Sequence, residues 1–195
     1  MCGINGIYNF SFQGHLSYHD YVSKMNSLIK YRGPDSNGIW ICKDQNIALG
    51  HQRLSIQDLS DKGNQPMQSS KKNVITYNGE IYNFLELKNN NIEGTLVSNS
   101  DTEVLLNLYD KFRDDCLKDL NGMFAFGIWD QLNKELFLAR DRIGIKPLYF
   151  TTLNGIFAFS SEIKSLLSLP WVDTELNESE LYNFLTFNKT TAPNT

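Results

Sequence analysis

Hydrophobic and polar positions alternate along many short stretches of the chain, a period typical of strands with one buried face. Gly, Asn, Asp and Pro cluster between these stretches and favour turns. Most of the stretches follow one another closely, as in hairpins; one pair meets at Asn154-Gly155, a common tight turn. We predict strands over residues 3–10, 39–42, 47–54, 74–79, 123–130, 134–141, 148–152 and 156–161.

Apolar residues recur three and four positions apart in other segments, which indicates amphipathic helices. Ser17 and Asn177 precede two of these segments and are candidate N-caps. Five helices are predicted, over residues 17–30, 80–90, 98–112, 161–169 and 177–187, with Glu80 in the first turn of the second. Helices mixed with hairpin-linked strands predict an α+β protein with mainly antiparallel sheets.

Composition narrows the class of protein. The 195 residues suit one sizeable domain, and 41% hydrophobic and 21% charged residues are ordinary for a globular chain. A net charge of −4 without a basic stripe argues against nucleic acid, and no apolar run is long enough to cross a membrane. Three widely spaced cysteines form neither a disulfide framework nor a zinc site, which favours the cytoplasm. His15 and His19 have metal-pair spacing but no third ligand, so we predict no metal.

Cys2 stands directly behind the initiator methionine. A structural thiol has little reason to be at a chain end, where order is usually poor. Removal of Met1 would give Cys2 a free α-amine with an ordinary pKa of about 7.7–8.0. That amine can accept the thiol proton, so one residue would supply both nucleophile and general base.

A thiolate that attacks an amide needs donors for the developing oxyanion, and Asn78-Gly79 supplies two candidates. By itself Asn-Gly is more simply a tight turn. Arg53, at a predicted strand end, has the planar fork that binds a carboxylate, although it could be a solvated surface charge. Asp101, at a predicted helix start, is either an N-cap or a partner for an ammonium group. Carboxylate, ammonium and reactive amide are all present in free glutamine.

Nine motifs, taken together and in order, resemble the glutaminase domain of class II, N-terminal-nucleophile glutamine amidotransferases. The resemblance covers nearly the whole chain and is strongest to the N-terminal half of glutamine-dependent asparagine synthetases. The motifs are MCGI.GI (1–7), YRGPD..G (31–38), GHQRLSI (50–56), QPM (65–67), YNGEIYN (77–83), SDTE (100–103), LNGMFAFGIWD (120–130), ARDRIGIKPLY (139–149) and FSSEIKSL (159–166).

The resemblance implies a four-layer α-β-β-α sandwich of two mainly antiparallel sheets. It implies that Cys2 is the nucleophile and that Asn78 and Gly79 form the oxyanion hole. Arg53 would hold the glutamine α-carboxylate and Asp101 the α-ammonium. Glu80 would lie beside the substrate, and Ile56 and Gln57 would offer backbone contacts.

Two residues depart from the family pattern. Tyr31 stands where many relatives carry histidine, and Asn5 replaces a small apolar residue in the first strand. The asparagine needs a hydrogen-bond partner if it is buried.

The resemblance also bears on domains and partners. Residues 1–175 would form the glutaminase domain, and 176–195 would begin the linker or helix to a missing ATP-dependent synthetase domain. The chain contains no glycine-rich pyrophosphate loop, so ATP and magnesium are expected only in that domain and no cofactor in this one. L-Glutamine is the expected substrate, aspartate the default ammonia acceptor, and a homodimer is left open.

Three alternatives stay open at this point. The acceptor could be another carboxylate, such as a sugar acid. The chain could hydrolyse a different amide, although Arg53 and Asp101 together favour a free amino acid. It could also be a non-catalytic interaction module, although none of the expected site residues is lost.

Overall fold

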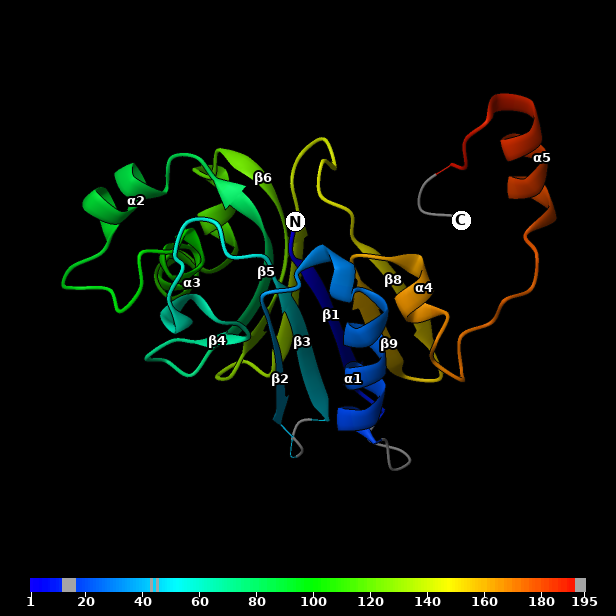
Figure 1. Cartoon of the computed structure of the whole chain (residues 1–195), viewed down its shortest axis with the longest axis horizontal. Coiled ribbons are helices and arrows are strands. Elements are labelled where there is room, and N and C mark those ends of the chain that lie inside the picture. The colour runs from blue at the N-terminus through cyan, green and yellow to red at the C-terminus, as the bar shows by residue number, and fades with distance from the viewer. Residues whose placement is uncertain (12–16, 43, 45, 192–195) are drawn as a thin grey trace.

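Two antiparallel sheets stack face to face (Figure 1) in the computed structural model, which describes residues 1–11, 17–42, 44 and 46–191. The first sheet has the order β2-β3-β1-β9-β8 and the second the order β4-β5-β6-β7. The strands are β1 (Gly3–Asn9), β2 (Ser36–Cys42), β3 (Ile47–Arg53), β4 (Met67–Gln68), β5 (Val74–Ile81), β6 (Gly122–Asp130), β7 (Glu135–Arg140), β8 (Tyr149–Leu153) and β9 (Ile156–Ser160).

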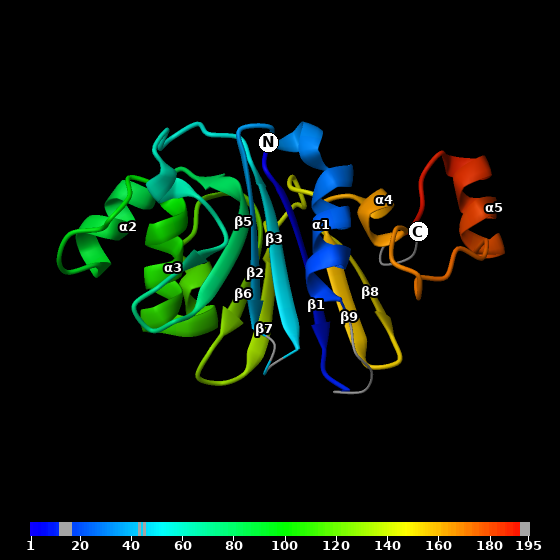
Figure 2. The ribbon, with the colours of Figure 1, turned by 60° about the horizontal axis from the view of Figure 1, so that its bottom comes forward.

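Helices cover the two outer faces, as Figure 2 shows. Helices α1 (Tyr18–Leu28) and α4 (Ile163–Leu166) pack on the first sheet, and α2 (Phe84–Asn91) and α3 (Asp101–Phe112) pack on the second. The order of layers is therefore α-β-β-α, which confirms the predicted fold class. Short 3₁₀ turns described in full are η1 (Lys30–Arg32), η3 (Asp61–Gly63) and η4 (Arg113–Lys118).

Each interface between layers has its own hydrophobic core, because the side chains of a strand alternate between its two faces. In β1, Ile4 points toward the other sheet and packs with Leu49 and Trp129. Ile7, three residues on, points outward and packs under α1. The alternation seen in the sequence thus places both faces of a central strand in apolar surroundings.

The buried side-chain amide nitrogen of Asn5 has a hydrogen-bond partner. Its side-chain Nδ2 donates to Oδ1 of Asn26 on α1 at 2.7 Å, inside the layer between helix and sheet. No space remains for a side chain on the neighbouring strand, since a Cβ at Gly50 would lie 2.5 Å from Oδ1 of Asn5. The polar pair therefore fixes how α1 sits on the first sheet.

The predicted helix over 80–90 was wrong at its start. Strand β5 continues to Ile81, with Glu80 opposite Met123 and Ile81 opposite Gly122, and α2 begins only at Phe84. Helical spacing of apolar residues gave way to ladder hydrogen bonds with β6, a tertiary effect that local patterns do not report. Glu80 consequently lies in a strand beside Asn78 and Gly79.

Other elements differ in length or were not predicted. The strand predicted over 39–42 begins earlier, at Ser36, because β2 pairs with β3 from that residue onward. A short strand that was not predicted, β4, lies between the predicted strands over 47–54 and 74–79. The predicted helix over 161–169 is the single turn α4. Ser17 does not cap α1, since its hydroxyl donates to Asp20, whereas the predicted cap Asn177 accepts from the backbone N–H of Glu180 at 3.2 Å.

Helix α5 (Glu178–Phe187) stands apart from the sandwich in Figures 1 and 2. It starts just after the predicted domain boundary at 175–176, which stays a prediction. Within the described part of the chain, no helix has the length and apolar character needed to cross a bilayer. Of the two histidines with metal-pair spacing, His15 lies outside the described residues.

Candidate active site

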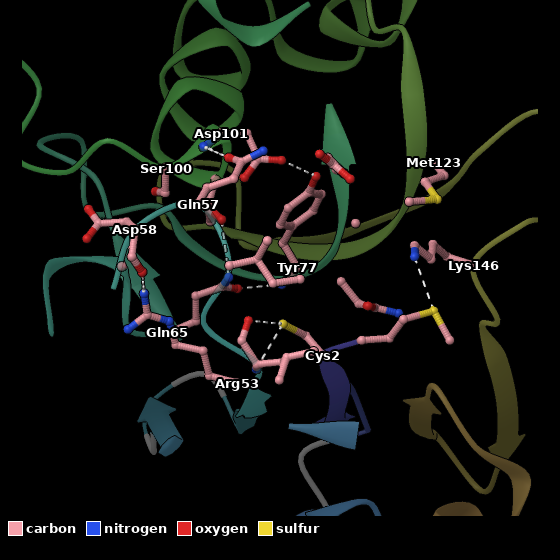
Figure 3. A pocket seen from close by; sticks show the side chains of 18 residues that line it. Cys2, Arg53, Gln57, Asp58, Gln65, Tyr77, Ser100, Asp101, Met123 and Lys146 are labelled. Atoms are coloured by element: carbon pink, nitrogen blue, oxygen red, sulfur yellow. Dashed lines mark hydrogen bonds between the residues drawn. The ribbon is translucent and has the colours of Figure 1, made fainter. Parts of the chain in front are cut away.

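The site lies at one end of the space between the two sheets, where strand pairing brings distant residues together. Cys2 precedes β1, and Gly3 lies opposite Gln52, so the start of β1 is beside the end of β3 and Arg53. Asn78 approaches from β5 of the facing sheet. A cavity of about 150 Å³ opens there (Figure 3), lined by Met1, Cys2, Arg53, Leu54, Ile56, Gln57, Asp58, Gly63, Gln65, Tyr77, Asn78, Gly79, Glu80, Ser100, Asp101, Thr102, Met123 and Lys146.

The Cys2 thiol is held against the backbone of Leu54. Its Sγ accepts from the Leu54 N–H at 3.4 Å and donates to the Leu54 carbonyl oxygen at 3.6 Å. Burial raises the pKa of the thiol, while the Leu54 amide, the N-terminal ammonium and Arg53 oppose that rise. A thiol with a raised pKa is poorly ionised near neutral pH, so a nucleophilic role would require a base close by.

Arg32 holds the main chain at Cys2. Its Nε donates to the carbonyl oxygen of Cys2 at 3.0 Å, and its Nη1 pairs with Glu162 at 2.5 Å. Both side chains belong to stretches that resembled the family, YRGPD and FSSEIKSL, but neither was assigned a role from the sequence.

Asn78 supplies a buried donor without a partner. The residue is 1% exposed, and its Nδ2 forms no hydrogen bond with any described residue. Buried polar groups are nearly always paired, and an unpaired one costs about 1–3 kcal/mol. Because Asn78 lines the cavity that contains the Cys2 thiol, this donor is suited to an oxyanion that forms during a reaction.

Gly79 lines the same cavity. A Cβ at this position would lie 2.5 Å from the carbonyl oxygen of Met123 on β6. Close strand pairing therefore requires glycine at this position.

The Arg53 guanidinium is enclosed by the segment that follows β3. Its Nη1 donates to the Ser60 carbonyl and to Asn64 Oδ1, each at 2.8 Å, and its Nη2 donates to the Asp58 carbonyl. A Cβ at Gly63 would clash with Nη2. All three acceptors are uncharged, so Arg53 keeps a net positive charge at the cavity wall, ready for a carboxylate.

Asp58 organises this segment without forming an ion pair with Arg53. Its Oδ1 accepts from the backbone and hydroxyl of Ser60, and its Oδ2 accepts from the Asn99 N–H at 2.9 Å. The Ser60 and Asn99 donors lower the pKa of Asp58 to about 2. Sequence reasoning missed this support; Asp-x-Ser, a spacing that favours a local side-chain turn, was the available signal.

Asp101 faces the cavity as a buried carboxylate. Its Oδ2 accepts from the Tyr77 hydroxyl at 2.6 Å and from the Ile81 N–H at 3.0 Å. Ser100, rather than Asp101, is the N-cap of α3. Burial raises the pKa of Asp101 above its ordinary value, and no Lys, Arg or His nitrogen of the described residues lies within 4.0 Å of it.

The other predicted residues also line the cavity. Glu80 is half-buried in β5, and Ile56 is 69% exposed at the rim. Gln57 reaches the far wall, where its Oε1 accepts from the Asp101 backbone N–H at 3.2 Å. The structure thus brings all eight predicted site residues to one cavity.

Two further residues were quoted within motifs but given no role. Gln65 bridges the walls, since its Oε1 accepts from the Tyr77 N–H at 2.7 Å and its Nε2 donates to the Thr102 hydroxyl at 3.2 Å. Lys146, from the IKPLY stretch, reaches the cavity across Cys2 from Arg53 (Figure 3). Its Nζ donates to Met1 Sδ at 3.2 Å.

Comparisons with known proteins are consistent with this geometry. Residues 1–195 match a family model described as a glutamine amidotransferase domain. The putative asparagine synthetase [glutamine-hydrolyzing] 2 of Methanocaldococcus jannaschii is 44% identical over 94% of this chain and 37% of its own length. Asparagine synthetase [glutamine-hydrolyzing] 1 of Bacillus subtilis is 38% identical over the whole chain and 31% of its own length. The chain therefore spans about a third of the length of these two curated relatives.

A solved structure shares the fold. Glutamine phosphoribosylpyrophosphate amidotransferase from B. subtilis superimposes with a TM-score of 0.69 at 21% identity, over 85% of this chain and 43% of that one. At that identity the likeness concerns the sandwich architecture and not the site.

Proposed function

The chain belongs to the glutamine amidotransferase domain family, and we propose that it hydrolyses the side-chain amide of L-glutamine through a thioester on Cys2. One observation carries the proposal: a single cavity joins the Cys2 thiol to the unpaired amide donor of Asn78 and to two opposite charges, Arg53 and Asp101. A free α-amino acid with a side-chain amide matches this arrangement. Its amide suits the thiol and the Asn78 donor, its carboxylate suits Arg53, and its ammonium suits Asp101.

In the proposed complex, the two charged walls bind the α-groups of glutamine. The Arg53 guanidinium takes the carboxylate, and the Asp101 carboxylate takes the ammonium. Glu80, Ile56 and Gln57 complete the walls. This binding places the side-chain amide at Cys2, because the charged residues and the thiol lie at different parts of one cavity.

Removal of Met1 is part of the proposal, since with Met1 attached the nitrogen of Cys2 is an amide and cannot act as a base. After removal, the α-amine takes the thiol proton while sulfur adds to the amide carbon. Asn78 Nδ2, with Gly79, donates to the oxyanion that forms, a contribution of about 2.7–4 kcal/mol per donor. The α-ammonium then returns its proton to the amide nitrogen as the C–N bond breaks, and that nitrogen leaves as ammonia.

The second half of the reaction releases glutamate. The α-amine accepts a proton from water as its oxygen adds to the thioester carbon, and Asn78 again donates to the oxyanion. The C–S bond breaks, and the proton returns to the thiolate. Glutamate leaves, and Cys2 is regenerated as thiol and amine.

We further propose that the ammonia passes to an ATP-dependent synthetase domain of the asparagine synthetase type, with aspartate as acceptor. The names and greater length of the relatives support this. ATP and Mg²⁺ would then bind only in that further domain, reached through residues 176–195, and no cofactor would be needed in 1–175. A sugar acid as acceptor is the alternative. Saturable binding of ATP to residues 1–195 in calorimetry would contradict the division.

The compartment and assembly are proposals as well. The free thiols of Cys2, Cys42 and Cys116 are suited to the reducing cytoplasm. A homodimer is compatible with the proposal but is not required by it, because every residue assigned to the reaction comes from one chain.

The nucleophile provides the decisive test. Cys2→Ala in the Met1-processed protein should reduce glutamate release at least about 10³-fold, because no other thiol lines the cavity. Cys42→Ala removes a thiol from the opposite end of the first sheet and should leave turnover unchanged. Glutamine should be preferred over simple acyl amides, which lack the α-groups. Turnover that survives in Cys2→Ala would show that another residue is the nucleophile.

A further inference from the structure

Lys146 enters the cavity from the segment between β7 and β8, and its backbone is tightly held. Asp141 Oδ2 accepts from the Lys146 N–H at 2.9 Å, and Asp141 Oδ1 accepts from the Ile145 N–H at 2.7 Å. Arg140 Nε donates to the Lys146 carbonyl oxygen at 2.5 Å. The side chain is therefore directed into the cavity by three fixed contacts and not by chance surface packing.

The charge of Lys146 is buried without a counter-ion. The residue is 4% exposed, and no carboxylate of the described residues lies within 4.0 Å of its Nζ. The one hydrogen bond that its Nζ forms with a described residue is to Met1 Sδ, a weak acceptor, and that bond disappears when Met1 is removed. Burial, and then the charge of Arg32, lower the pKa of Lys146. A buried ammonium of this kind costs stability, which points to a functional reason for it.

Several charged groups surround the N-terminus, and they differ in the partners that they already have. Arg32 is paired with Glu162, and the Arg53 guanidinium is bound to carbonyl oxygens. Three carboxylates line the same cavity: Asp58, Glu80 on β5 and Asp101 on α3. Asp141, on the segment that carries Lys146, is occupied by backbone donors.

In the chain that retains Met1, the two neighbouring cations act on the Met1 ammonium in the same direction. Burial lowers the pKa of this ammonium, the charge of Cys2 opposes the fall, and the charges of Arg32 and Lys146 lower the pKa further. Of these two cations, only Lys146 has no carboxylate partner within 4.0 Å among the described residues.

We propose that Lys146 is a positioning residue that acts through its charge: its ammonium holds the amine and thiol of processed Cys2 with one proton fewer at neutral pH. This inference rests on the proposed function, in which Cys2 is the nucleophile and its amine is the base. A nearby cation disfavours any further positive charge and favours a thiolate.

The sign of the effect does not depend on which group holds the proton. Amine and thiol share one residue, so they titrate as a coupled pair with macroscopic pKa values. In the fully protonated state, Cys2 carries an ammonium and a neutral thiol. The first proton is lost from this state. Whether the ammonium or the thiol loses it, the net charge beside Lys146 falls by one. Loss of the Lys146 charge must therefore raise this first pKa and move the acidic limb of the rate profile to higher pH.

The test compares kcat/KM for glutamine between pH 5 and 9 in processed wild type, Lys146→Met and Lys146→Arg. In Lys146→Met the acidic limb should move up by about one pH unit, a loss of about tenfold below the limb that recovers at high pH. Lys146→Arg keeps the charge and should keep the limb near its wild-type position. Lys189→Met, which removes an exposed lysine far from the cavity, is the matched control and should change nothing.

A second measurement avoids turnover altogether. The rate of Cys2 alkylation by iodoacetamide, followed by mass spectrometry across the same pH range, should show the same upward shift in Lys146→Met. Methionine has a similar length and removes a buried unpaired charge, so this variant should melt no lower than wild type. Lys146→Gln provides a second neutral side chain if methionine does not fold.

Each result decides the question. An unchanged acidic limb in the neutral variants overturns the inference. So does a pH-independent rise in KM, which would place Lys146 in substrate binding. So does an equal loss of rate at every pH, which would indicate a purely structural role. Failure of the proposed function looks different, because Cys2→Ala would then retain turnover whatever Lys146 does.

Discussion

Two cavities of the molecule contain a buried aspartate that accepts a hydrogen bond from a tyrosine, yet their electrostatics are opposite. At the Cys2 end, Tyr77 donates to Asp101 at 2.6 Å. At the turn between β6 and β7, Tyr109 donates to Asp130 at 3.3 Å. Burial raises the pKa of Asp101. Burial has the same tendency at Asp130, but hydrogen bonds from Asn133 and the charge of Arg113 lower the pKa of that carboxyl.

The difference comes from partners. Asp130 accepts from the N–H groups of Leu132 and Asn133, from Asn133 Nδ2, and from Arg113 Nη1 at 3.0 Å. Asp101 has no basic side chain within 4.0 Å among the described residues. The cavity beside Asp130 is the larger of the two, about 360 Å³ against about 150 Å³. The candidate active site is therefore distinguished by charged and hydrogen-bonding groups that lack partners. Its volume does not distinguish it.

The largest expected effect concerns the two asparagines. Asn78→Ala removes a donor that has no partner in the free protein but would meet the oxyanion. We expect kcat to fall about 10²–10³-fold. Asn133→Ala removes a donor that Asp130 already uses, so it should lower the free energy of unfolding by about 0.5–1.5 kcal/mol and leave kcat unchanged. Glutaminase kinetics and denaturant unfolding of both variants measure the contrast. A kcat for Asn78→Ala within a few-fold of wild type would remove Asn78 from the oxyanion hole.

A smaller effect is expected for the two aspartates. Asp101→Asn keeps the shape but cannot neutralise the ammonium of glutamine, so kcat/KM should fall about 10–100-fold, mostly through KM. Asp130→Asn loses the charge that Arg113 pairs with. Because Arg113 is 45% exposed, we expect at most about 1 kcal/mol of lost stability from this ion pair and unchanged kinetics. If Asp130→Asn raised KM as much as Asp101→Asn, the comparison between the two ends would fail.

The sequence predicted the features that have local signals and missed contacts between distant residues. Alternation and turn residues predicted most strands and the hairpins, because those signals are local. Resemblance supplied the layer order and the site residues, and the structure brings all of these residues to one cavity. Asp58 also accepts from the Asn99 N–H, and Lys146 donates to Met1 Sδ; both contacts join residues distant in sequence and have no local signal.

His51 shows the limit most clearly. It lies between the sheets, where its ring Nε2 bonds the Tyr77 carbonyl at 3.1 Å and links β3 to β5 just behind the cavity. Burial lowers its pKa to about 4, so the ring is neutral near pH 7 and Nε2 is the donor. From the sequence, His51 had no role beyond its place in the motif GHQRLSI, because a hydrogen bond between two sheets depends on the fold.

The two tyrosines give the smallest and most specific test. In the proposed site, the Tyr77 hydroxyl and the Ile81 N–H hold one oxygen of Asp101 and so orient the carboxylate for the ammonium of glutamine. Tyr77→Phe removes one of these two donors and leaves the charge of Asp101 in place. We expect KM for glutamine to rise about three- to tenfold with kcat within twofold of wild type, equivalent to one hydrogen bond of about 1 kcal/mol.

Tyr109→Phe is the matched control, because it removes a hydroxyl from the other buried aspartate. Asp130 keeps its bonds from Arg113 and Asn133, so its position does not depend on Tyr109. Kinetics should stay at wild-type values, with at most about 1 kcal/mol of lost stability. An equal KM for Tyr77→Phe and wild type would mean that the Ile81 N–H alone orients Asp101. A fall in kcat without a change in KM would instead place Tyr77 near the reacting amide and away from the α-ammonium.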